Sequence, residues 1–107
     1  MISQITIQDQ SGHQIIDLSD LMFFQQDNHF TVFHLTGFAT IVADRSFEEV
    51  EKTLADSGFF GINKNTVINL VHLDSFTNDT IILADGTRLM ISRRKVDEFQ
   101  KIVCSRH

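Results

Sequence analysis

Three short polar segments of this 107-residue chain carry side chains that could bind nucleic acid. They are Asn28-His29, Asn63-Lys64-Asn65 and Arg93-Arg94-Lys95. Arginine and lysine bind phosphate, arginine also pairs with guanine, asparagine pairs with adenine, and histidine is a small donor. Spacing along the chain does not show whether the three segments meet in space, so the elements that carry them have to be considered.

The Arg93-Arg94-Lys95 segment stands at the predicted start of a short C-terminal helix. Ser92 is a plausible N-cap, and Val96 and Phe99 begin an apolar stripe. The N-terminus of a helix carries about half a positive charge, so three cations in the first turn oppose the macrodipole. Exposed backbone N–H groups beside three cations suit a phosphate group. The alternative is exposed charge that the helix simply tolerates.

Catalysis and metal binding find little support in the sequence. Phosphate-binding glycine loops, dinucleotide-binding motifs and the paired histidines of zinc proteases do not occur in it. Cys104 lies near the C-terminus without a partner base, and the 5 histidines lack the spacing of metal ligands. Asp74, Asp79 and Asp85 occupy or flank predicted turns, where aspartate has a local hydrogen-bonding role. We therefore expect no enzyme activity, no metal and no cofactor.

Length and composition predict a single soluble domain over residues 1–107. The one cysteine cannot form an internal disulfide, which fits a reducing compartment. No apolar run approaches the ~20 residues of a membrane span, and the residues after Met1 alternate rather than forming a signal peptide. These features predict a cytoplasmic protein without membrane contact.

The net charge of −5 argues against nucleic-acid binding if the chain is taken as a whole. Its distribution is uneven, because residues 1–58 carry nine acids and two bases (−7), whereas residues 59–107 carry five acids and seven bases (+2). Screening limits each surface charge to about 10 Å at 0.1 M salt, so a basic patch can still attract phosphate. The alternative is a solvated surface of mixed charge.

Alternating apolar residues predict a mainly β fold. A hairpin is expected over residues 5–18, a buried strand at Leu21–Phe24 and a polar loop over residues 25–29, followed by an alternating strand over residues 30–36. Further strands are expected over residues 38–43, 66–76 (as one strand or two), 80–84 and 87–91, with Asp85-Gly86 as a hairpin turn.

One helix is predicted in mid-chain, over residues 46–57. Ser46-Phe-Glu-Glu49 is a capping box. Phe47, Val50 and Leu54 follow at helical spacing, and Gly58 stands where a glycine commonly ends such a helix. Together with the short C-terminal helix, this gives a mainly β chain with two helices.

The chain resembles the LytTR DNA-binding domain of bacterial response regulators from about residue 17 to residue 102. Four blocks in the family's order and spacing carry the resemblance. They are Asp17–Phe24, which matches the family's first strand; Ser46–Leu54, similar to S-L-x-E-L-E-x-x-L; Phe59–Asn69, similar to F-x-R-I-H-R-S-x-I-V-N; and Asp85–Arg94, similar to D-G-x-x-L-x-V-S-R-R.

The resemblance implies an elongated β fold of several small sheets, with loops that enter successive major grooves of DNA. Carried over by position, it implies DNA contacts from His29, Lys64 and Arg94, with the remaining residues of the three polar segments as neighbours. Asn69 matches a family position too, and we interpret it as structural. The resemblance further implies promoter direct repeats as targets, often bound by two copies, and a receiver domain as the usual preceding module.

The sequence departs from the family pattern at Gly61, Asn63 and Asn65, where Arg, His and Ser are usual. Two possible cationic contacts are thereby lost, and the middle segment keeps only Lys64. We therefore hold two hypotheses: sequence-specific binding of double-stranded DNA in transcription regulation, or a protein-interaction or anti-regulator module that kept the fold and lost DNA binding. The acidic N-terminal half, and sheet edges near residues 2–18 that could pair with another chain, motivate the second.

Overall fold

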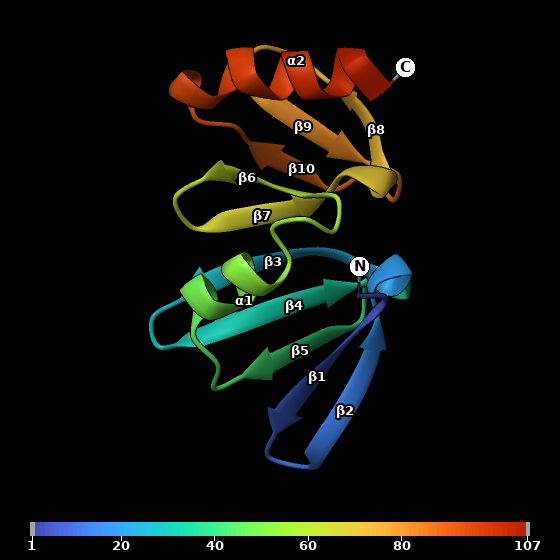
Figure 1. The fold of residues 1–107 in the computed structure, drawn as a ribbon, viewed down its shortest axis with the longest axis vertical. Helices are drawn as coiled ribbons and strands as arrows, with labels where there is room; N and C mark the ends of the chain where they lie inside the picture. Colours follow the sequence, from blue (N-terminus) through green and yellow to red (C-terminus); the bar gives the residue numbers. More distant parts are fainter. Residues whose placement is uncertain (1, 107) are drawn as a thin grey trace.

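Three antiparallel sheets follow one another along the long axis of the chain (Figure 1). The structure is a computed structural model and describes residues 2–106, so Met1 and His107 lie outside it. The molecule measures 39 × 26 × 25 Å. The predicted elongated, multi-sheet β fold is confirmed. None of the helices in the described part of the chain is long and apolar enough to cross a membrane.

The strands divide among the sheets by sequence region. The first sheet is the hairpin of β1 (Gln4–Asp9) and β2 (Gly12–Asp17). The central sheet contains β3 (Leu21–Asp27), β4 (Phe30–Leu35), β5 (Thr40–Ala43), β6 (Phe59–Asn63) and β7 (Thr66–Asn69), in the order β5-β4-β3-β7-β6. The third sheet contains β8 (Leu73–Phe76), β9 (Thr80–Leu83) and β10 (Arg88–Met90), with β9 in the middle.

The two helices lie against different sheets. In Figure 1, α1 (Phe47–Thr53) lies beside the central sheet, and α2 (Val96–Arg106) covers the third sheet at the end of the molecule. Each helix belongs to its own apolar cluster. Phe47 and Val50 of α1 pack in a cluster with Phe24, and Phe99 of α2 packs in a cluster with Phe23.

Strand β3 is therefore buried on both of its faces, which explains its continuous apolar run. Phe24 is fully buried, and its ring lies 5.5 Å from that of Phe47 and 6.1 Å from that of Phe59, centroid to centroid. A strand with an apolar environment on each face carries consecutive rather than alternating apolar residues. The predicted buried strand at Leu21–Phe24 is confirmed.

The expected loop over residues 25–29 is wrong, because β3 continues to Asp27. Residues 25–27 pair with residues 30–32 of β4, which leaves only Asn28 and His29 in the turn. Asn28 has a positive φ of 57°, a conformation that asparagine tolerates better than most residues. Polar residues occur in this part of β3 because its side chains are half-buried or exposed rather than in the core.

The mid-chain helix begins as predicted and ends earlier. The Ser46 hydroxyl accepts a hydrogen bond from the Glu49 N–H at 3.4 Å, as the capping box requires. The prediction that the helix reaches residue 57 is wrong, since α1 ends at Thr53. Residues 54–58 form tight turns, with the Ser57 N–H bonded to the Leu54 carbonyl at 3.1 Å. Burial of the Leu54 side chain in the core holds this compact exit from the helix.

The segment 66–76 forms two strands that belong to different sheets. A 3-10 turn over Leu70–His72 separates β7 from β8. Asn69 is buried at this corner, and its Nδ2 donates to the carbonyls of Leu18 and Leu21, each at 2.9 Å. These bonds give the structural role expected for Asn69 a physical basis. Strand β6 (Phe59–Asn63) was not predicted as a strand. The remaining strands lie within two residues of the expected bounds.

Candidate nucleic-acid interface

The three predicted polar segments lie along one edge of the molecule. Strands β3 and β6 both pair antiparallel with β7, so they run in the same direction and end at the same edge of the central sheet. The Gln26 N–H donates to the Asn65 carbonyl at 2.9 Å, which fixes the first two connections side by side. The Ser92 N–H donates to the Ile62 carbonyl at 2.8 Å and brings the third connection to the same edge.

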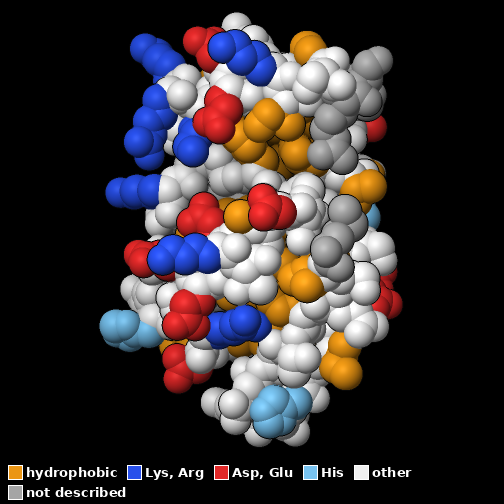
Figure 2. Space-filling view, in the orientation of Figure 1, with side chains coloured by type: hydrophobic (Ala, Val, Ile, Leu, Met, Phe, Trp, Pro, Cys, Tyr) orange, Lys and Arg blue, Asp and Glu red, His pale blue; other side chains and the backbone are white. Residues whose placement is uncertain are grey.

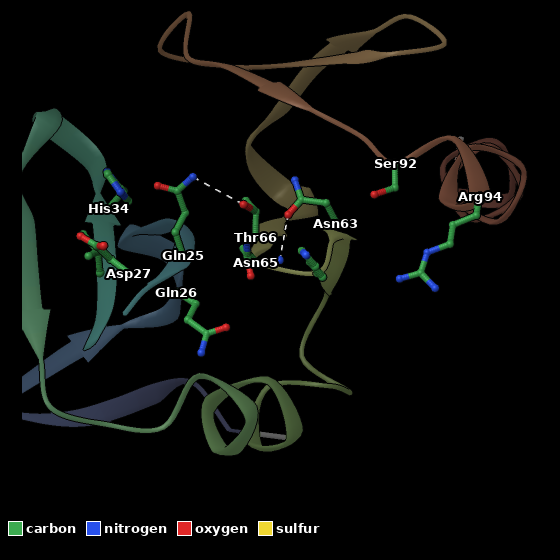
Figure 3. Close-up of a pocket in the computed structure, with 11 residues that line it drawn as sticks. Gln25, Gln26, Asp27, His34, Asn63, Asn65, Thr66, Ser92 and Arg94 are labelled. Atoms are coloured by element: carbon green, nitrogen blue, oxygen red, sulfur yellow. Dashed lines mark hydrogen bonds between the residues drawn. The ribbon is translucent and has the colours of Figure 1, made fainter. Parts of the chain in front are cut away.

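An open groove of about 870 Å3 lies between these connections. One wall is the end of β3, from Gln25 to Asp27, and the other is formed by residues 63–65 and Arg94 (Figure 3). Gln25 donates to the Thr66 hydroxyl at 3.5 Å across the floor of the groove. Four of the predicted site residues line this groove: Asn63, Lys64, Asn65 and Arg94.

In the middle segment, the side chain of Asn63 is hydrogen-bonded within the protein, whereas those of Lys64 and Asn65 are exposed. The Asn63 Nδ2 donates to the Met90 carbonyl at 2.9 Å, and its Oδ1 accepts from the Asn65 N–H at 2.9 Å. Both ends of this amide therefore hold the turn and link it to β10. Lys64 and Asn65 are exposed at the tip. The geometry gives Asn63 a positioning role and leaves Lys64 and Asn65 able to contact a ligand.

The three consecutive cations of the third segment face different surroundings. Arg94 lines the groove, whereas Arg93 lines a separate hollow together with Asp79 and Asp97. The Lys95 Nζ lies 5.7 Å from the centroid of the Phe60 ring, a cation–π arrangement. Arg94 is thus the cation of this segment that shares the groove with Lys64.

The start of the C-terminal helix differs from the prediction. Residues Arg93–Lys95 form a 3-10 turn, and the Ser92 side chain makes no capping hydrogen bond. The α-helix begins at Val96, and the acids Asp97 and Glu98 occupy its first turn, where the macrodipole favours negative charge. The three cations therefore precede the α-helix and do not oppose its dipole from within the first turn.

The first segment contributes to this edge in an unexpected way. Asn28 and His29 are exposed at the tip of the β3–β4 turn, and neither lines the groove. The residues of this region that line the groove are instead Gln25, Gln26 and Asp27, which the sequence prediction assigned to a loop. No local signal in the sequence marks this continuation of β3, because it depends on pairing with β4.

Positive charge gathers along the same edge. Figure 2 shows lysine and arginine side chains on the left of the upper half, beside the start of α2 and the ends of β6 and β7. Acidic side chains are spread over both halves of this view. Basic side chains are thus concentrated at this edge, near the groove, whereas acidic ones are not confined to one region.

His34 lies on the side of the groove opposite Arg94 (Figure 3) and adds little positive charge at neutral pH. Burial lowers the pKa of His34 below its ordinary value of 6.5, and nearby Asp85 opposes this shift in part. Its Nε2 atom is buried and has no hydrogen-bond partner.

His72, which we expected on a strand, lies in the 3-10 turn over Leu70–His72, and its Nε2 contacts the Ser19 carbonyl at 2.6 Å.

Gly61 faces helix α1 and not the groove. A Cβ atom built at residue 61 would lie 3.1 Å from the Glu51 Oε2 atom of α1. Because a glutamate carboxylate would face a side chain at this position, Gly61 bears on the contact between β6 and α1 more directly than on the groove.

Within residues 2–106, no cluster of three or more His, Cys, Asp or Glu side chains is placed to hold a metal ion.

Two comparisons with known proteins found matches, one for the fold and one for the family. A solved structure described as the LytTr DNA-binding domain of a response regulator from Bacillus cereus matches with a TM-score of 0.79 and 19% identity. The match covers 96% of this chain and 98% of that chain, and at this identity it shows the fold. No curated protein sequence matches the chain. The model of the LytTr DNA-binding domain family, which is a family of DNA-binding domains and not of enzymes, matches residues 12–103. The chain therefore belongs to the LytTr DNA-binding domain family.

Proposed function

We propose that this chain binds double-stranded DNA in a sequence-specific manner, through loops in the major groove, and regulates transcription as the output domain of a response regulator. The observation that carries the proposal is the meeting of Lys64, Asn65 and Arg94 at one groove. These residues come from two connections that are separated in sequence by β7 and the whole of the third sheet. Their convergence places two cations and an amide, residue types that contact phosphates and bases, on one surface.

Each cation has a distinct task in this proposal. Arg94 pairs with a guanine in the major groove, since its planar guanidinium matches guanine O6 and N7 and discriminates against other bases by about 1–3 kcal/mol. Lys64 carries a compact charge on a flexible stem and binds phosphate. Arg93 and Lys95 flank Arg94 and contribute to phosphate binding. His29 and Asn28, at the tip of the neighbouring β3–β4 turn, enter the adjacent part of the DNA major groove.

The overall negative charge of the chain is compatible with this role. At 0.1 M salt the interactions of surface charges are screened over about 10 Å, whereas the molecule is 39 Å long. Acids that lie well beyond 10 Å from the basic edge therefore affect it only weakly. Binding to phosphates releases counterions, so affinity should fall steeply with salt.

The test is fluorescence anisotropy of a labelled random-sequence duplex at several salt concentrations, with wild type, Arg94→Ala and the control Arg88→Ala. Arg88 is exposed on β10 and does not line the groove. We expect salt-dependent binding that Arg94→Ala weakens about fivefold or more and Arg88→Ala changes less. Circular dichroism establishes that both variants are folded. Equal losses in the two variants, or no binding by wild type at about 50 mM salt, would contradict the proposal.

A protein-interaction or anti-regulator role is the second candidate. Strand β2 lies at the end of the first sheet, and Ile15 on it is 68% exposed. An exposed strand edge with apolar side chains can pair with another chain. This candidate predicts capture of a protein partner that is insensitive to salt, together with no DNA binding even at low salt. Salt-sensitive DNA binding that depends on Arg94 would exclude it as the main function.

We further propose that the targets are promoter direct repeats, occupied by two copies of the domain, and that a receiver domain controls it. The family resemblance motivates both statements. Titration of a duplex carrying one or two copies of a selected site, followed by analytical ultracentrifugation, would test the first. A stoichiometry of one protein on the two-site duplex would contradict it.

A further inference from the structure

Asp27 is a carboxylate at the basic groove. It is the last residue of β3 and it is exposed. Among the described residues that line the groove, it is the only one with an acidic side chain. Arg94 stands on the opposite wall (Figure 3), and Lys64 lines the same groove. A domain that only needed affinity for phosphate would do better with a neutral side chain at this position.

The Asp27 carboxylate differs from others that serve their own turns. Asp9 accepts a hydrogen bond from the Ser11 N–H at 2.8 Å, and Asp79 accepts from the hydroxyls of Thr77 and Thr80. Among the groove residues drawn in Figure 3, hydrogen bonds join Gln25 to Thr66 and Asn63 to Asn65, and none involves Asp27. Asp27 thus lines the groove and makes no hydrogen bond to the other groove residues drawn there.

The chemistry of a carboxylate restricts what it can bind in DNA. An ionised carboxylate only accepts hydrogen bonds, so it cannot bond to phosphate oxygens and is repelled by their charge. In the major groove, the exposed donors are the amino groups of cytosine N4 and adenine N6. A carboxylate in such an interface is tolerated where a base amino group faces it and opposes binding everywhere else.

We infer that Asp27 is a specificity-determining residue that weakens binding to non-specific DNA and accepts a hydrogen bond from a cytosine or adenine amino group in the target. This inference rests on the proposed DNA-binding function. Specificity is a difference between affinities, and a repulsive group that acts on the wrong partners raises it as effectively as a new attraction to the right one. Gln26, exposed beside Asp27, could pair with an adjacent adenine.

The experiment compares two labelled duplexes: a random-sequence duplex, and one recovered by selection with the wild-type protein from a random library. Dissociation constants are measured for wild type, Asp27→Asn and the control Asp20→Asn. Asp20 is exposed and immediately precedes β3, whose last residue is Asp27, so seven residue steps separate the two aspartates. At ~3.3 Å per step this is about 23 Å, or roughly two screening lengths at 0.1 M salt. Both substitutions remove one negative charge.

The decisive quantity is the ratio of the dissociation constant for the random duplex to that for the selected duplex. We expect Asp27→Asn to bind random duplex about two- to fivefold more tightly at 0.1 M salt, to gain less on the selected duplex, and so to lower the ratio. Asp20→Asn should leave the ratio at the wild-type value. An unchanged or higher ratio for Asp27→Asn, or an equal fall in both variants, overturns the inference. Absence of any DNA binding by wild type would instead refute the proposed function.

Discussion

Phe23 and His34 stack face to face across the β3–β4 pair, with ring centroids 4.1 Å apart and ring planes 7° apart. The stack covers one face of the imidazole and forms part of the boundary between the groove and the apolar cluster around α2. Burial in this position lowers the pKa of His34 and leaves its Nε2 atom without a hydrogen-bond partner. The folded protein therefore favours the neutral imidazole.

This relationship predicts how stability depends on pH. In the unfolded chain His34 takes up a proton near pH 6.5, whereas in the folded chain it does so only at lower pH. The unfolded state then binds more protons, so the His34 contribution is complete above pH 6.5 and stability falls as pH decreases from 6.5 toward the folded pKa. Urea denaturation of wild type and His34→Phe at pH 8, 6 and 5 should show a smaller loss in the variant. His13→Gln, at an exposed position, is the control, and equal losses in all three proteins would contradict the prediction.

Asn69→Ala should destabilise the fold by about 2–4 kcal/mol, because the carbonyls of Leu18 and Leu21 lose a buried donor. The same amide also accepts from the Val71 N–H at the corner between the central and third sheets. Chemical denaturation measures the loss. Asn78→Ala is the matched control, since Asn78 is exposed and accepts a bond of 3.4 Å from Gln100. A loss for Asn69→Ala as small as that for Asn78→Ala would exclude the corner role.

Lys64→Ala should reduce the salt dependence of DNA binding. Each phosphate contact contributes about 0.9 to the slope of log K against log salt, so removal of one contact should lower the slope by about that amount. The variant should remain fully folded, because Lys64 is exposed at the tip of the β6–β7 turn. Lys101→Ala, exposed on α2 and outside the groove, should leave the slope unchanged. Identical slopes for Lys64→Ala and wild type would remove Lys64 from the interface.

Packing of α2 should influence DNA binding without any change in the groove itself. Phe99 is buried, and its ring lies 5.5 Å from that of Phe60 and 5.0 Å from that of Phe76. Phe99→Ala should cost about 3–5 kcal/mol and weaken the anchoring of the helix that continues directly from the Arg94 turn. Phe99→Leu should cost less than about 1.5 kcal/mol if the core repacks. We expect affinity for DNA to fall in the order wild type, Phe99→Leu, Phe99→Ala when all are measured under folding conditions. Equal affinities would show that the turn is held independently of α2.

Features of this protein that depend on neighbouring residues could be predicted from the sequence. The capping box fixes the start of α1 because Ser46 and Glu49 are one helical turn apart. A hairpin turn forms at the predicted place, although it is centred on Ala84 and Asp85 and is one residue longer than an Asp85-Gly86 turn. Gly86 closes it, with its N–H bonded to the Leu83 carbonyl at 2.9 Å and a φ of 90° that glycine adopts at low cost. The apolar run Leu21–Phe24 indicated a buried strand, since only a strand with two covered faces needs consecutive apolar residues.

Features that depend on distant partners could not be predicted in this way. The continuation of β3 to Asp27 depends on pairing with β4, and the division of residues 66–76 between two sheets depends on the corner that Asn69 holds. The end of α1 at Thr53 depends on burial of Leu54 in the core. Hydrogen bonds and burial across the fold decide each of these boundaries, and the local sequence carries no record of them.

The residue types of the candidate interface could be read from the amino-acid sequence alone, whereas the fold establishes which of these residues share a surface. Arg93, Arg94 and Lys95 are equivalent as a sequence motif. In the 3-10 turn that they form, three residues complete one turn, so successive side chains project about 120° apart. Arg94 therefore lines the groove, while Arg93 faces the hollow with Asp79 and Lys95 covers the Phe60 ring. The direction of each side chain therefore depends on how β10 and α2 hold the two ends of the turn.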